Sequence, residues 1–432
     1  MKTKKTIKGK LLTAISPERV LFLDPGYLVI SEDGNIEDVC KEIPTGGEQD
    51  PEYYDLSDKL ICPGFVDIHN HLPQFTLSGL YRGNLFEWLS DIVFPAEGRF
   101  SSPEVAERFA ERFFKELLSK GTTTTSSYVT SHKEATDIAF QCAEKSGIRA
   151  FLGNVLMNQN APDYLIKDTP ILLRDSEELI EKWEGHDNGR LRYVLTPRFA
   201  PSCSFDLLQG IGKIAKKRGV HIQSHLAESK AEIATVMDIF PDLENYTDVY
   251  FKAGLLTEKT IAAHCIYLNE GEIEILKKTG TKVSHCPSSN RFLQSGIMPY
   301  RKLEKSGIPI GLGTDVGAGY SLSMFSEMRE AIESSKTIHF LDTSAVYNPL
   351  TSIEAFYLAT LGGAKALTIE DETGSLEQGK SADFSVIDIA QLNVCNENFF
   401  SNPEDLISKL IYSNGENYIE EVYIKGKLVY KK

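Results

Sequence analysis

Hydrophobic and polar positions follow one pattern at the two ends of the chain and another between them. Over residues 1–60 and 376–432, short apolar runs are separated by turn residues, which is typical of β-hairpins. In the middle, short apolar runs alternate with longer stretches of helical period. Residues 102–121 are an example, with one apolar face and Gly121 as a helix stop signal. The pattern predicts terminal strands around a central strand–helix repeat.

The apolar runs of the central part supply eight candidate strands. Because a helical stretch follows most of them, the alternation predicts an α/β fold, a (β/α)8 TIM-like barrel. We expect residues 61–375 to form this barrel, and 1–60 with 376–432 to form a small β-sandwich domain built from both termini. The expected barrel strands are 64–71, 122–129, 149–157, 192–199, 219–226, 260–267, 281–288 and 308–315.

The charge of the chain limits its partners. Because 46 Lys and Arg residues stand against 61 Asp and Glu residues, the formal net charge is −15. An acidic surface repels phosphate backbones and anionic lipids, so we expect neither nucleic acid nor a membrane as a partner. A small neutral or cationic molecule fits better as the ligand.

Cysteine usage and the N-terminal residues indicate the compartment. The seven cysteines are scattered and form no CxxC pair, which favours reduced thiols in a cytoplasmic protein. Pro17, Glu18 and Arg19 interrupt the basic start of the chain, so we expect no signal peptide. The longest apolar runs fall short of the roughly 18 residues of a transmembrane helix, so we expect none.

Polar side chains gather at the carboxyl ends of the predicted strands, where barrel enzymes keep their chemistry. His69 and His71 lie two residues apart in one strand, so both imidazoles face the same way, although alone this pair is a weak motif. His225 ends the fifth strand, and Asp315 ends the glycine-rich eighth strand, where a buried carboxylate needs a partner or a metal. Three imidazoles and a carboxylate would bind one zinc or iron ion, which makes hydroxide available near neutral pH.

Three further polar residues follow the same strand ends. Glu228 lies three residues after His225, where its carboxylate could reach over the metal and shuttle protons. The alternative is a helix N-terminal glutamate that complements the helix dipole. His264 and His285 lie at the ends of the sixth and seventh strands, and either could hydrogen-bond an attacking water. We favour His264 for that role and leave His285 open between this role and a supporting position.

With these residues, the chain resembles members of the amidohydrolase superfamily, in its mononuclear zinc aminohydrolase branch. The segments PGFVDIHNH, HLAE, HCPSSN and GLGTD carry the resemblance, and Arg198, where a lysine would bridge two metals, favours a single metal. Closer motifs are similar to those of the guanine deaminase family, and this resemblance spans essentially the whole chain. These motifs are HNHLPQF (69–75), EWLSDIVFPAEGRF (87–100), TPRFAPSCS (196–204), SHLAES (224–229) and GTDVGAGYSLSMFSEMREAI (313–332).

The resemblance implies an activity and an assembly. It implies a homodimeric hydrolase that removes the C2 amine of guanine, giving xanthine and ammonia in purine catabolism or salvage. It implies Glu228 as the proton shuttle, Asp315 as an acceptor of a proton from the water, and His264 as the residue that orients this water. The implied zinc ligands, which would also accept iron, are His69, His71, His225 and Asp315.

The expected substrate contacts have chemistry that suits a purine. The guanidinium of Arg198 offers a rigid fork of donors to the O6 acceptor, and the amide of Gln74 suits a purine edge. Aromatic rings can cover the faces of the base. The resemblance and this chemistry together imply as substrate-binding residues Gln74, Trp88, Arg198, Phe199 and the expected metal ligands His71 and His225.

Two other readings stay open at this point. A related aminohydrolase would act on another amino-heterocycle, such as an adenosine-type nucleoside or a triazine. A catalytically inactive barrel would serve as a scaffold, but such a barrel needs neither the metal ligands nor Glu228, and all of them are present.

Overall fold

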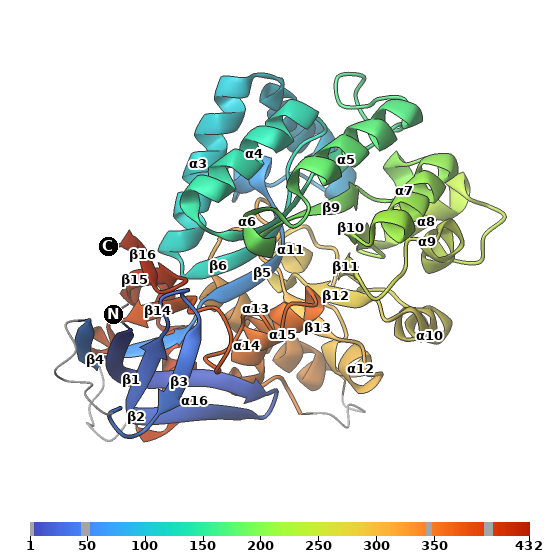
Figure 1. Cartoon of the computed structure of the whole chain (residues 1–432). Helices are drawn as coiled ribbons and strands as arrows, with labels where there is room; N and C mark the ends of the chain where they lie inside the picture. The colour runs from blue at the N-terminus through green and yellow to red at the C-terminus, as the bar shows by residue number, and fades with distance from the viewer. Residues whose placement is uncertain (1–3, 45–51, 343–347, 393–400) are drawn as a thin grey trace.

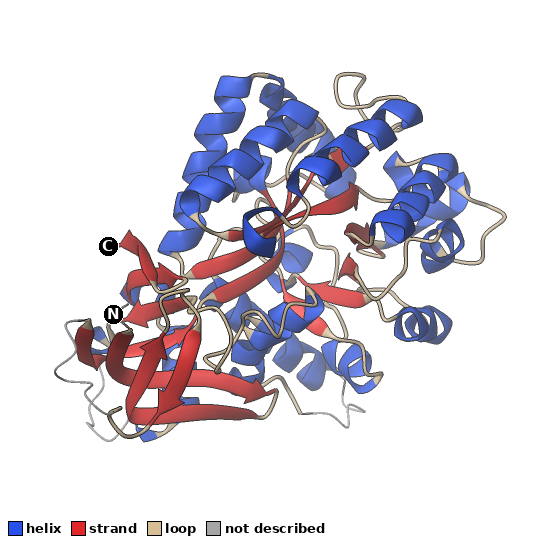
Figure 2. Cartoon of the chain, in the orientation of Figure 1, coloured by secondary structure: helices blue, strands red, loops and turns tan. Residues whose placement is uncertain are grey.

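The computed structural model describes residues 4–44, 52–342, 348–392 and 401–432. In these ranges the strands belong to two sheets, and helices surround the larger sheet (Figure 2). The first and the last described strands both belong to the smaller sheet, at one side of the molecule (Figure 1).

The larger sheet is the predicted barrel. Its eight main strands run parallel in the order β5-β6-β7-β9-β10-β11-β12-β13, and the short β8 pairs with β9. Their residues are almost all buried, because helices cover the outside and side chains fill the inside. Each of the eight predicted strands is present. Their bounds are β5 (Phe65–His71), β6 (Thr122–Tyr128), β7 (Arg149–Gly153), β8 (Val155–Leu156), β9 (Leu191–Pro197), β10 (His221–Leu226), β11 (Thr260–His264), β12 (Lys282–His285) and β13 (Ile310–Leu312).

The first and last strands of the barrel meet just beyond the end of β13. The backbone N–H of Asp315 donates to the carbonyl of His69 over 2.8 Å, and the N–H of His71 donates to the carbonyl of Val316 over 3.0 Å. These bonds join β5 to the chain that leaves β13, so the sheet is a nearly closed barrel. The prediction of a TIM-like barrel is confirmed, and the closing seam carries three of the predicted metal ligands.

The helices follow the expected local signals. In α3 (Pro103–Ser119), the hydroxyl of Ser102 caps the N-terminus by accepting from the N–H of Val105, and Gly121, with φ of +80°, follows its end. The other helices are α1 (Leu85–Trp88), α2 (Phe94–Gly98), α4 (Lys133–Ser146), α5 (Thr169–Trp183), α6 (His186–Gly189), α7 (Phe205–Arg218), α8 (Lys230–Ile239), α9 (Tyr246–Ala253), α10 (Glu270–Thr279), α11 (Pro287–Phe292), α12 (Tyr300–Lys305), α13 (Met324–Leu341), α14 (Ser352–Leu358), α15 (Leu361–Ala366) and α16 (Pro403–Tyr412).

Strand β6 is polar although it lies within the barrel wall. Its sequence is TTTTSSY, and every residue is buried. Ser127 donates to the side-chain carbonyl of Asn70 over 2.6 Å, and the Asn70 amide donates to Thr125 over 2.8 Å. Ser126 donates to Gln223 over 2.8 Å. These hydroxyls therefore have partners and support β5 next to its two histidines, whereas those of Thr122, Thr123, Thr124 and Tyr128 have none among the described residues.

The smaller sheet joins the two ends of the chain. Its seven strands follow the order β16-β15-β14-β4-β1-β2-β3, and all neighbours are antiparallel except β1 and β4. The predicted β-sandwich domain is thus built on one continuous hydrogen-bonded sheet. The domain division into 1–60 with 376–432 and 61–375 stays a prediction. The strands are β1 (Lys5–Ser16), β2 (Arg19–Ile30), β3 (Ile36–Cys40), β4 (Tyr53–Pro63), β14 (Phe384–Ile387), β15 (Ile419–Ile424) and β16 (Lys427–Lys431).

Two further expectations can be compared with the described ranges. The cysteines there are free thiols, and five of the six are buried; Cys395 lies outside the described residues. No helix in these ranges combines the length and the apolarity that a membrane crossing requires.

Candidate metal centre and substrate pocket

The two histidines at the end of β5 are held by their neighbours in the strand. Asn70, between them, points the opposite way, and its amide donates to Asp67 over 2.9 Å. The Asp67 carboxylate also accepts from the backbone N–H of Thr314, over 3.0 Å, and from the Thr314 hydroxyl, over 2.6 Å. The strand that bears His69 and His71 is therefore tied to the chain that leads into Asp315.

Four buried ligand side chains converge on one point. One potential ligand atom from each of the four residues lies within 4.8 Å of all the others. Nε2 of His69 and Nε2 of His71 lie 3.2 and 3.1 Å from Oδ1 of Asp315, and Nε2 of His225 lies 3.3 Å from Nε2 of His71. Nδ1 of His225 faces the carbonyl oxygen of Arg198 at 2.5 Å. Since a carbonyl only accepts, Nδ1 carries the proton, and the lone pair of Nε2 faces the cluster.

The electrostatics of the cluster fit a divalent metal. Burial lowers the pKa of His69 to about 4 and the pKa of His225 well below its usual value, so both rings are neutral and offer lone pairs. Although burial opposes it, the neighbouring histidines hold the pKa of Asp315 well below its ordinary value. Both ring nitrogens of His69 are buried without a hydrogen-bond partner among the described residues. Buried, unpartnered nitrogens beside a carboxylate are the donor set that zinc or iron binds.

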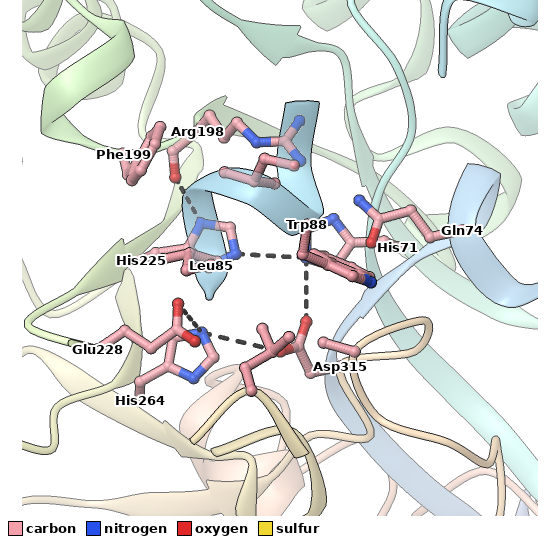
Figure 3. Close-up of a pocket in the computed structure, with 13 residues that line it drawn as sticks. His71, Gln74, Leu85, Trp88, Arg198, Phe199, His225, Glu228, His264 and Asp315 are labelled. Carbon is pink, nitrogen blue, oxygen red and sulfur yellow. Dashed lines mark hydrogen bonds and ion pairs between the residues drawn. The ribbon is translucent and has the colours of Figure 1, made fainter. Parts of the chain in front are cut away.

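The predicted substrate and catalytic residues line one pocket at this cluster (Figure 3). His69 belongs to the ligand cluster but does not line the pocket, and all nine other predicted site residues do. Four apolar residues that sequence analysis did not single out complete the wall. The lining residues are His71, Gln74, Leu85, Trp88, Leu89, Arg198, Phe199, His225, Glu228, His264, Leu293, Asp315 and Ala318.

Glu228 faces the pocket from the segment that follows β10. Its Oε1 accepts a hydrogen bond from the Ser295 hydroxyl over 2.8 Å, and its backbone N–H donates to Glu232 over 2.8 Å. Burial raises the pKa of the Glu228 carboxyl. A buried carboxyl with a raised pKa takes up and releases a proton more readily near neutral pH than an exposed one.

His264, at the end of β11, faces both carboxylates of the pocket. Its Nε2 lies 3.6 Å from Glu228 and 3.8 Å from Asp315, and its Nδ1 donates to the side-chain oxygen Oδ1 of Asn290 over 2.8 Å. Burial would lower the pKa of this imidazole, but the two carboxylates raise it above the usual value. His285 is buried on β12 and is not among the pocket-lining residues; its ring stacks on Tyr300 instead.

A residue that sequence analysis did not predict lies behind two polar residues of the pocket wall. Glu97, which is completely buried, accepts from Nη1 of Arg198 with both carboxylate oxygens, over 3.1 and 2.8 Å. The same Oε1 accepts from Nε2 of Gln74 over 2.8 Å. The two predicted substrate contacts are therefore linked through one carboxylate.

A short irregular helical segment forms the apolar wall and also holds Arg198. It runs from α1 through the π-helical turn η3 (Leu89–Val93) into α2. Its first part presents Leu85, Trp88 and Leu89 to the pocket, opposite Phe199. In α2, Phe94 lies under the Arg198 guanidinium, 5.3 Å from its central carbon to the ring centroid. π-helical turns are frequent at functional sites, because they shift the helix face by one residue.

The amidohydrolase family model matches residues 60–429, which is most of the chain. The chain belongs to the amidohydrolase family. The match covers the barrel and the strands that follow it, so the architecture and the family agree.

Among the amidohydrolases, the proteins similar to this chain include guanine deaminases, as the motifs predicted. The guanine deaminase of Escherichia coli K12 is 35% identical over 450 residues, covering 100% of this chain and 98% of that protein. The structure of a guanine deaminase from C. acetobutylicum with bound guanine has a TM-score of 0.92 at 33% identity, covering 99% of this chain and 100% of that one. A zinc-bound adenosine deaminase from Xanthomonas campestris has a TM-score of 0.83 at 26% identity, covering 99% and 92%.

Sequence analysis did not predict the residues of this amidohydrolase that hold the side chains of the pocket and of the ligand cluster in place. They are Glu97, which joins Arg198 to Gln74; Asn290 and Ser295, which bond His264 and Glu228; and Tyr128, whose ring packs against the three histidines of the cluster. The motif FPAE contained Glu97, but its partner Arg198 lies 101 residues further along the chain. Spacing in the sequence gives no signal for such a pair.

Gly313 leaves no room for a side chain beside the ligand cluster. A Cβ at this position would lie 2.6 Å from Cβ of His69 and 2.5 Å from the Ser284 hydroxyl oxygen. We expect Gly313→Ala to displace His69 and weaken metal binding by at least about tenfold. Competition with a chromophoric chelator measures this affinity. The matched control is Gly271→Ala in α10, whose Cβ would meet only one side-chain oxygen at 3.2 Å; equal affinities in both variants would contradict the expectation.

Proposed function

We propose that this amidohydrolase is a zinc-dependent guanine deaminase, which hydrolyses the C2 amine of guanine to give xanthine and ammonia. One observation carries the proposal: a buried His3Asp cluster opens into a pocket that also contains Glu228, a fixed arginine and amide, and flat apolar walls. The chain matches guanine deaminases over nearly their full length, and this similarity supports the same activity.

The four ligands would hold the metal at the floor of the pocket. A divalent cation supplies a water molecule whose pKa is lowered towards neutrality, and so a nucleophile at physiological pH. Zinc is supported by the donor set and by the zinc-bound relative, although the same donors also accept iron. The free thiols support a cytoplasmic location. The homodimer is proposed from the family resemblance alone.

The chain's own residues would move the protons of the reaction. Glu228, with its raised pKa, donates a proton to ring nitrogen N3 as water adds to C2. Asp315 accepts a proton from the water, and His264, held by Asn290, orients the water towards C2. The C2 amine then takes a proton and leaves as ammonia. One guanine and one water thus give one xanthine and one ammonia.

The walls of the pocket suit a free purine base. Arg198 offers donors to the O6 acceptor, and Gln74 offers an amide to the neighbouring edge. Trp88 and Phe199 lie where they can cover the faces of the ring (Figure 3). The Trp88 indole is fixed, because its N–H donates to the Leu80 carbonyl over 2.8 Å.

Substrate turnover tests the proposal directly. The zinc-loaded protein is given guanine, adenosine, cytosine or an aminotriazine, and ammonia and the deaminated oxo product are measured for each. We expect turnover of guanine to xanthine at a kcat/KM at least about a hundredfold above the other three. Turnover of adenosine or the triazine in place of guanine would contradict the proposed substrate and support the other amino-heterocycle.

Glu228→Gln tests the proton shuttle. The amide keeps the size of the side chain but cannot exchange a proton, so kcat for guanine should fall by at least about a hundredfold. Metal content, measured by atomic emission, should be unchanged. Glu274→Gln, on the exposed face of α10, is the matched control. A rate for Glu228→Gln close to that of the control would show that another group carries the proton.

A further inference from the structure

Glu97 occupies a position that the proposed reaction does not use. It lies at the end of α2, completely buried, and touches neither the ligand cluster nor the pocket surface. Its partners are the side chains of Gln74 and Arg198, which do line the pocket. A buried carboxylate is costly unless it is paired, and here both oxygens are used on these two residues.

The bond to Glu97 fixes which way the Gln74 amide faces. A carboxylate only accepts hydrogen bonds, so the amide atom at 2.8 Å from Oε1 must be the Nε2 donor. The carbonyl oxygen of Gln74 is then the amide atom left for the pocket. In the view of Figure 3, Nε2 lies on the side of Arg198 and the carbonyl oxygen on the side of His71. Gln74 thus presents an acceptor, not a donor, to a bound ligand.

The same carboxylate fixes the guanidinium of Arg198. Nη1 donates to both Glu97 oxygens, and the ring of Phe94 supports the guanidinium plane. The donors Nη2 and Nε of the fork remain. Since Nη1 and the Gln74 amide nitrogen bind the same oxygen atom, the acceptor of Gln74 and the donors of Arg198 lie side by side.

An adjacent acceptor and donor recognise one kind of purine edge. In a 6-oxopurine, the N1–H donor lies next to the O6 acceptor, which matches this pair. In a 6-aminopurine the order is reversed, because N1 accepts and the amine donates. We propose that Glu97 is a positioning residue that sets the polarity of Gln74 and Arg198 and thereby selects purines with an N1–H and O6 edge. This inference rests on the proposed function, because it assumes that a purine base occupies the pocket.

The competing explanation is that Glu97 only neutralises a buried arginine. In that case its loss would weaken the binding of every ligand, or the fold itself, to a similar extent. A positioning role instead predicts a loss confined to ligands that offer the N1–H and O6 edge. The ratio of two binding constants separates these roles, whereas a single activity does not.

The test uses two ligands that have no amine to lose. Hypoxanthine offers the N1–H and O6 edge, and unsubstituted purine does not. Their dissociation constants are measured by isothermal titration calorimetry on the zinc-loaded wild type and on Glu97→Gln, with Glu107→Gln on the exposed face of α3 as the matched control. We expect the wild type and the control to bind hypoxanthine at least about tenfold more tightly than purine. In Glu97→Gln this preference should largely disappear while purine affinity stays within about twofold.

A second variant keeps the test decisive if Glu97→Gln does not fold. Gln74→Met removes the acceptor and leaves the pair of Glu97 and Arg198 intact, so it should also lose the preference for hypoxanthine. The proposal is overturned if the wild type shows no preference, if these variants keep the wild-type ratio, or if both ligands weaken equally. A wild type that prefers hypoxanthine but does not deaminate guanine would contradict the proposed activity alone.

Discussion

The closing seam of the barrel is the constraint on which the site depends. Where β5 meets the chain after β13, two backbone hydrogen bonds hold His69, His71 and Asp315 within reach of one point. The alternation of a β-strand puts both imidazoles on the inner face. Asn70, between them, hydrogen-bonds Asp67 and Thr125 and so holds the strand in place. Gly313 lets the strands approach, since any side chain there would collide with His69. The convergence of the predicted metal ligands is thus a consequence of how the barrel closes.

The pocket wall is organised around a second buried charge. The segment from α1 to α2 presents apolar residues to the pocket at its start, and at its end supplies Phe94 and Glu97, which hold Arg198. One helical segment therefore shapes the cavity and sets the direction of its polar groups. The interior of the site has low dielectric, so an unpaired charge there would be costly, and Glu97 and Arg198 are paired with each other.

The sequence predicted the barrel and the side chains of the site because these depend on local patterns. The alternation of short strand segments with helical stretches predicted all eight strands, and the His-x-His spacing, HLAE and GLGTD placed the charged residues at strand ends. Polar strand β6 was predicted from its position in the alternation, but its bonds to Asn70 and Gln223 follow only from the neighbouring strands. Pairs distant in sequence, such as Glu97 with Arg198 or Asn290 with His264, arise from packing and have no local signal. The continuous sheet formed by both termini has the same origin, since its register joins strands from opposite ends of the chain.

Titration of the metal-free protein with zinc tests most directly whether one ion at the closing seam drives guanine deamination. The metal is removed with a chelator, zinc is added back in steps, and the rate of xanthine formation is followed at each step. Our account predicts no turnover without metal, a rate that rises in proportion to added zinc, and a break at a single equivalent per chain. Full turnover in the metal-free protein, or a rate that continues to rise to a second equivalent, would contradict it.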